Sequence, residues 1–109
     1  MEQAVDSRLN KVFAALADSS RRKILTRLAQ GPAAIVDLAR DLPFTRQAAT
    51  KHLLTLRKAG LVEDRKQGRA QVYELTPDSL LCAEQWIEGL EADWDRRLGA
   101  LARHLRENP

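Results

Sequence analysis

Apolar residues along the chain recur at steps of three and four positions, the spacing that places side chains on one face of a helix. This periodicity predicts an N-terminal helix over residues 5–17 and a further helix over residues 33–42. Between them it predicts a helix that begins after Asp18 and ends before Gly31. Aspartate is a favoured cap for a first turn, and glycine commonly follows a last turn. We therefore expect three helices before the middle of the chain.

A fourth helix is expected over residues 46–59, because Pro43 and Phe44 interrupt the preceding pattern and Thr45 is placed to cap a new helix. Two helices joined by a turn of about three residues form a helix-turn-helix unit, here residues 33–59.

Residues 61–75 change to a strand-like pattern around a turn that contains Gly68, which predicts a β-hairpin. A hairpin in this position after a helix-turn-helix is a wing. The predicted fold is mainly α with a small β-hairpin, a winged helix-turn-helix in one domain over residues 1–109.

The last predicted helix covers residues 77–106, with Thr76 as its cap and Pro77 in its first turn. Its apolar residues follow one stripe, and acidic residues line the opposite side. Thirty helical residues span about 45 Å, which exceeds the diameter of a compact body of this size. We expect part of the stripe to pack against a second copy, which predicts a homodimer.

Charge is distributed unevenly along the 109 residues, although the net charge is only +3. Residues 45–69 hold seven lysines or arginines and two acids, a local charge of +5. Residues 84–95 hold five acids and no base. The first region suits a polyanion such as nucleic acid.

Several classes of function are not supported by the sequence. No apolar run approaches the roughly 20 residues of a membrane span, and the N-terminus lacks the layout of a signal peptide, so we expect a cytoplasmic protein. The single cysteine, Cys82, excludes an internal disulfide and is expected to be an inert thiol. No catalytic motif or phosphate-binding loop is present, so we expect no enzyme activity and no cofactor.

Three segments together resemble the ArsR family of bacterial winged helix-turn-helix transcriptional regulators. They are residues 13–18 followed by 21–25, residues 45–53, and residues 59–62 with the following Arg65, Gly68 and Arg69. The family pattern usually has Pro-Thr where this chain has Ser19 and Ser20. The resemblance implies a homodimer joined through the first and last helices, with two recognition helices in adjacent major grooves. It also implies repression, usually of a nearby operon, that a chemical signal relieves.

The family's metal-ligand motifs are not matched. The predicted third helix has no cysteine, and the last helix offers only Asp93, Asp95, His104 and Glu107, without the first histidine of the family's pattern. We expect no metal site, and a solvated acidic face instead. The chain resembles the branch without metal ligands, and an unknown small-molecule effector stays open.

The predicted recognition helix directs Ala49, Leu53 and Leu56 toward the core, which leaves a polar face for base edges. The residues expected to contact DNA are Thr45, Arg46, Gln47, Thr50, Lys51, His52, Arg57, Arg65, Lys66, Arg69 and Tyr73. Packing is an open alternative for His52 and Tyr73, and Arg57 also lies where cations favour the helix dipole.

The residues expected at the dimer interface share the apolar stripes of the first and last helices. They are Val5, Leu9, Val12, Phe13, Trp86, Leu90, Trp94, Leu98, Leu101 and Leu105. The alternative function is a winged-helix module that binds protein or RNA, since a fold does not determine a function. RNA readers usually present exposed aromatic residues, and residues 45–69 contain none.

Overall fold

The computed structural model describes the backbone of residues 2–108 and the side chains of residues 6–108. Five helices and three short strands follow one another along the chain. Their bounds are α1 Glu2–Leu16, α2 Ser19–Leu28, β1 Ala33–Ala34, α3 Ile35–Asp41, α4 Arg46–Lys58, β2 Val62–Gln67, β3 Ala70–Leu75 and α5 Pro77–Glu107. The expected order of helices, hairpin and long last helix is confirmed.

The sheet differs from the expected hairpin, because it contains a third strand. β1 pairs antiparallel with β3, with Ala33 opposite Tyr73 and Ala34 opposite Val72. The order across the sheet is β1-β3-β2. The expectation that the third helix starts at Ala33 was therefore wrong. These two residues are held extended by hydrogen bonding to a strand far away in the sequence, which outweighs the helical preference of alanine.

Local sequence accounts for most of the boundaries. Asp18 caps α2, with its Oδ1 atom accepting the backbone N–H groups of Ser20 at 2.8 Å and Arg21 at 3.1 Å. Gly60 follows α4 at a φ of +73°, a conformation that L side chains rarely adopt. α5 begins at Pro77 as expected, but the Thr76 hydroxyl makes no capping hydrogen bond. This oxygen is buried without a hydrogen-bond partner among the described residues.

The core lies where α1, α2, α3 and α4 meet the sheet and the first turns of α5. Ile24, Leu38, Leu53, Leu56 and Leu61 are its largest fully buried apolar residues. In α5 only Ser79 and Ala83 are buried. We call this packed part of the molecule, residues 6–83, the head.

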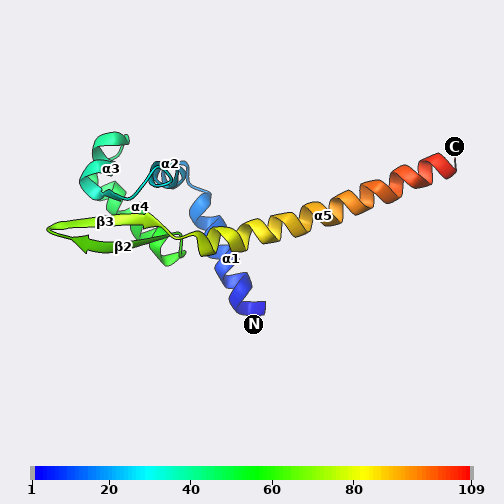
Figure 1. The fold of residues 1–109 in the computed structure, drawn as a ribbon, viewed down its shortest axis with the longest axis horizontal. Helices are drawn as coiled ribbons and strands as arrows, with labels where there is room; N and C mark the ends of the chain where they lie inside the picture. Colours follow the sequence, from blue (N-terminus) through cyan, green and yellow to red (C-terminus); the bar gives the residue numbers. More distant parts are fainter. Residues whose placement is uncertain (1, 109) are drawn as a thin grey trace.

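Beyond the head, α5 continues as a single projecting helix (Figure 1). It makes the molecule 69 Å long but only 32 and 20 Å in the other two directions. Near its start α5 crosses α1, where the rings of Phe13 and Trp86 meet edge to face with centroids 5.7 Å apart. No helix among the described residues combines the length and apolar character needed to cross a membrane.

Candidate nucleic-acid interface

The buried face of α4 fixes the orientation of its opposite face. Ala49, Leu53 and Leu56 have no exposed surface, as the periodicity predicted. At the start of the helix, the Thr45 hydroxyl oxygen accepts the backbone N–H of Ala48 at 3.1 Å. One face of α4 is thus packed against the head, and its first turn is closed by a side chain.

The opposite face of α4 presents Arg46, Gln47, Thr50 and Lys51, all exposed, in two successive turns. The Thr50 hydroxyl donates to the backbone carbonyl of Arg46 at 2.8 Å. Its proton is therefore used within the helix, and the methyl group remains for an apolar contact such as a thymine methyl. The two cations make no ion pair among the described residues. This face can offer both charge and hydrogen-bonding groups to a partner.

His52 occupies the boundary between the two faces of α4. Its ring is half-buried and packs edge to face against Phe44, with centroids 5.9 Å apart. This contact supports the packing alternative for His52, and a phosphate contact stays a prediction. The same contact links α4 to the turn that precedes it.

The wing is the hairpin of β2 and β3, whose strands pair from Val62 opposite Leu75 to Gln67 opposite Ala70. Gly68 stands in the turn between them at a φ of +64°. Next to the turn, Lys66 and Arg69 are exposed and make no ion pair among the side chains described. The tip of the wing therefore carries two uncompensated cations.

The base of the wing is tied to α4 by a carboxylate that the sequence did not single out. Asp64 Oδ1 lies 3.2 Å from Arg57 Nη1, and Asp64 Oδ2 accepts a hydrogen bond from the Gln71 amide. The Asp64 side chain is only 11% exposed. Burial and then the nearby Asp64 carboxylate raise the pKa of the half-buried Tyr73. The contacts of Asp64 with Arg57 and Gln71 therefore join the last turn of α4 to both strands of the hairpin.

Other predicted DNA-contacting residues are also engaged within the chain. Arg65 Nη1 lies 2.6 Å from Glu74 Oε1 across the hairpin. Tyr73 packs at the edge of the core, and Arg57 pairs with Asp64. Of the eleven residues predicted to contact DNA, six have exposed side chains that make no ion pair among the described residues. The side chains of the other five contact other residues of the head. The six are Arg46, Gln47, Thr50, Lys51, Lys66 and Arg69.

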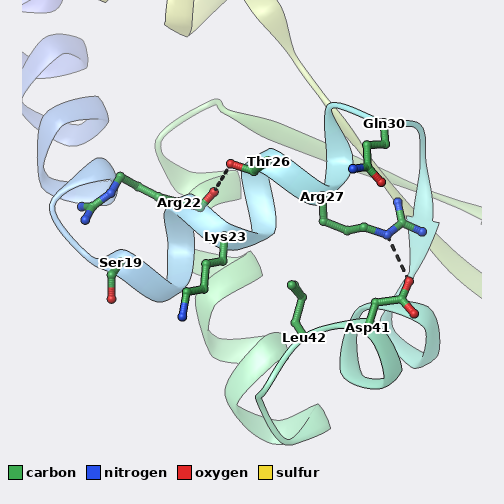
Figure 2. Close-up of a pocket in the computed structure, with 8 residues that line it drawn as sticks. All are labelled: Ser19, Arg22, Lys23, Thr26, Arg27, Gln30, Asp41 and Leu42. Atoms are coloured by element: carbon green, nitrogen blue, oxygen red, sulfur yellow. Dashed lines mark hydrogen bonds and ion pairs between the residues drawn. The ribbon is translucent and has the colours of Figure 1, made fainter.

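A hollow of about 610 Å³ lies between α2 and the end of α3 (Figure 2). Arg27 reaches across it to Asp41, with Nε 3.1 Å from Oδ2, whereas Lys23 points away from this pair. Hydrogen bonds from Arg40 and then Arg27 hold the pKa of Asp41 below its ordinary value. This ion pair, which local sequence patterns do not reveal, joins α2 and α3 ahead of α4.

The expected dimer-interface residues separate into buried and exposed groups. Leu9 is 8% exposed and Val12 has no exposed surface, so both belong to the core of the head, and their assignment to the interface was wrong. Periodicity shows that this face of α1 is apolar but not which element covers it. Phe13 is partly exposed beside Trp86, and the Val5 side chain lies outside the described ones.

The α5 residues of this set lie on the projecting helix, and each is between 48% and 60% exposed. They are Trp86, Leu90, Trp94, Leu98, Leu101 and Leu105. Their role at an interface stays a prediction. Asp93, Asp95, His104 and Glu107 are exposed as well, and the described side chains, those of residues 6–108, include no group of three placed to hold a metal ion.

Comparisons with known proteins agree on the class of fold. Residues 16–65 match the model of a helix-turn-helix domain. The HTH-type transcriptional regulator Rv2034 of Mycobacterium tuberculosis is 43% identical over 94 residues, which cover 86% of this chain and 85% of that protein.

Two solved structures have the same architecture. The ArsR-like transcriptional regulator from Rhodococcus sp. RHA1 superposes with a TM-score of 0.81 at 40% identity, over 92% of this chain and 94% of that one. A homodimeric winged helix-turn-helix DNA-binding domain from Mycobacterium bovis, a possible ArsR-family regulator, gives a TM-score of 0.69 at 31% identity. That match covers 84% of this chain and 86% of the other.

Proposed function

Because the chain belongs to the ArsR family of winged helix-turn-helix transcriptional regulators, we propose that it is a homodimeric repressor that binds a palindromic operator with α4 and the wing. The observation that carries this proposal is the exposed face of α4. It presents two unpaired cations, a glutamine amide and a threonine methyl above a fully buried opposite face.

In this proposal α4 reads the base sequence, whereas the wing binds phosphates. Gln47 can pair with the N6 and N7 edge of adenine, and Arg46 with O6 and N7 of guanine, so α4 supplies specificity. Lys66 and Arg69 at the tip of the wing supply contacts to phosphates, which position the protein and carry no sequence information. We propose repression because the arsenical resistance operon repressor of Escherichia coli is a relative, 32% identical over 100 residues. We also propose that the protein acts in the cytoplasm.

Two copies are needed for recognition of a palindrome. The homodimeric domain of Mycobacterium bovis supports this part of the proposal, as does the uncovered apolar stripe of α5. Two recognition helices related by a two-fold axis read half-sites about 10 base pairs apart, or a multiple of that spacing. Regulatory relatives and the absence of a catalytic motif in the sequence both support a function other than an enzyme.

Fluorescence anisotropy with operator DNA and two alanine variants tests these separate roles of α4 and the wing. Gln47→Ala is expected to lose about 1–3 kcal/mol of discrimination at one base position. Arg69→Ala is expected to weaken binding to all sequences and to lower the salt slope by about one.

Matched controls stand elsewhere on the chain. Gln30→Ala replaces an exposed glutamine that follows the end of α2, and Arg103→Ala replaces an exposed arginine of α5 that is outside the predicted DNA-contacting set. If Gln47→Ala and Arg69→Ala bind as their controls do, the proposed reading face is misplaced.

A further inference from the structure

Leu54 is the large apolar residue of α4 that remains exposed. It is 52% exposed, whereas Leu53 and Leu56 have no exposed surface. At about 3.6 residues per turn, Leu54 lies about 20° from Gln47 and about 40° from Thr50 around the helix axis. Leu54 is therefore on the face of α4 that is proposed to read bases, one turn beyond Thr50.

The neighbours of Leu54 along this face are cations. Lys51 precedes it by three positions and Lys58 follows it by four, the spacings at which side chains adjoin on a helix. Both lysines are exposed and make no ion pair among the described side chains. An apolar protein surface that covered Leu54 would also remove two ammonium groups from water, which costs free energy unless anions receive them. The face therefore suits a partner that combines an apolar group with anions on either side.

The major groove of DNA offers this combination. Phosphates line its edges, and thymine is the base that presents an apolar methyl group in the groove. Cytosine, guanine and adenine present hydrogen-bonding groups and no methyl group there. A leucine side chain cannot pair with those groups, and it would exclude the water that otherwise satisfies them. Leu54 thus favours thymine over the other three bases.

We infer that Leu54 is a specificity-determining residue that contacts the methyl group of a thymine in each half-site. This inference rests on the proposed function and adds one residue and one base to it. The methyl group of Thr50, whose hydroxyl donates to the Arg46 carbonyl, lies four residues earlier, a rise of about 6 Å. Successive base pairs are about 3.4 Å apart, so Thr50 and Leu54 reach thymines within about two base pairs of each other, on either strand.

Removal of single methyl groups from the DNA tests the contact. The probe is a duplex that the native protein selects from a random library, with 2′-deoxyuridine in place of one thymine of each half-site at a time. Uracil pairs as thymine does but lacks the methyl group. At a contacted position we expect the dissociation constant of the native protein, measured by fluorescence anisotropy, to rise about fourfold per methyl group, hence roughly 15-fold for both half-sites.

Leu54→Ala identifies the thymine that Leu54 contacts. Because the native side chain is half exposed, the substitution leaves the core of the head intact. We expect this variant to bind the unmodified duplex more weakly than the native protein does, and to change by less than about twofold when uracil replaces that thymine. Leu54→Met keeps an apolar side chain of similar volume and should retain the sensitivity.

Thr50→Ser provides the same test one turn earlier, since serine keeps the hydroxyl group but lacks the methyl group. We expect this variant to lose its sensitivity at a second thymine, within about two base pairs of the first. Leu81→Ala is the matched control, because Leu81 is exposed to a similar extent, 50%, but belongs to α5. It should keep the native sensitivity at both thymines.

The inference is overturned if the native protein binds every uracil-containing duplex as tightly as the unmodified one, or if Leu54→Ala keeps the native sensitivity at every position. Thymines of Leu54 and Thr50 that lie more than about three base pairs apart would also overturn it. In each of these cases the protein still selects a sequence, so the proposed function stands. If the native protein selects no sequence from the library, the proposed function itself is contradicted and the inference fails with it.

Discussion

α4 and α5 are both amphipathic helices, but only α4 finds the partner for its apolar face within its own chain. Leu53 and Leu56 of α4 have no exposed surface, whereas Leu98 and Leu101 of α5 are about half exposed. The apolar face of α4 therefore stabilises the head and sets the direction of its polar face. The apolar face of α5 contributes little to the head and is available for assembly.

The largest expected effect distinguishes a leucine buried in the head from a leucine exposed on α5. Leu53→Ala removes fully buried methyl groups, and we expect it to lower the free energy of unfolding by about 2–5 kcal/mol. Leu98→Ala at low protein concentration is expected to change the free energy of unfolding by less than about 0.5 kcal/mol. Urea unfolding at two protein concentrations measures both.

The dependence of stability on protein concentration gives a second comparison of these two variants. Native protein and Leu53→Ala are expected to become more stable as concentration rises, because dimerisation stabilises the folded state, and Leu98→Ala should show less of this gain. Equal losses for the two variants at low concentration would show that α5 belongs to the folding core.

An intermediate effect is expected at the junction of α4 and the wing. Asp64→Ala leaves Arg57 and Gln71 without their shared partner, so we expect a loss of about 1 kcal/mol in the free energy of unfolding. Operator affinity should fall several-fold because the wing is held less firmly against α4. Denaturation and anisotropy measure the two effects.

Glu63→Ala is the matched control for this junction, since Glu63 is an exposed acid next to Asp64 on the same strand. The proposed role of Asp64 fails if both substitutions have the same effect on stability and on DNA binding.

The smallest effect is a pH dependence at Asp18, the cap of α2. Hydrogen bonding by the backbone N–H of Arg21 is the largest contribution that lowers the pKa of Asp18 from its ordinary value of 3.8. A carboxyl group with a lowered pKa in the folded state contributes stability above the unfolded pKa, and this contribution is lost as the pH falls through the folded pKa.

Thermal unfolding of the native protein and of Asp18→Asn measures this contribution. Asparagine is also a good cap but does not titrate. The native protein should have the higher Tm above about pH 4, and the difference should disappear in more acidic solution. A constant difference in Tm over this range would exclude Asp18 as its source.

Much of this organisation was predictable from local patterns. The spacing of Ala49, Leu53 and Leu56 predicted the packed face of α4, and Asp18, Thr45 and Gly60 marked helix boundaries that the structure confirms. These signals are local because caps and helical periodicity depend on residues a few positions apart.

The features that were missed depend on contacts between distant residues. Ala33 and Ala34 form a strand because β3 lies beside them, and two alanines carry no strand pattern of their own. Val12 lies on an apolar helix face that the sequence alone assigns to an interface, but in the folded head it has no exposed surface. Asp64 meets Arg57 only because the wing folds back on α4. Periodicity identifies an apolar face, but the tertiary arrangement decides what covers it.

We propose above all that two copies of this chain read a specific DNA sequence through the exposed face of α4. The most direct test is a titration of the native protein on DNA from upstream of its own gene and on a shuffled duplex of equal length. We predict saturation at two protomers per duplex and a preference for the native sequence that persists at near-physiological salt. Equal binding to both duplexes that disappears as salt is raised would contradict it, since only counterion release would remain.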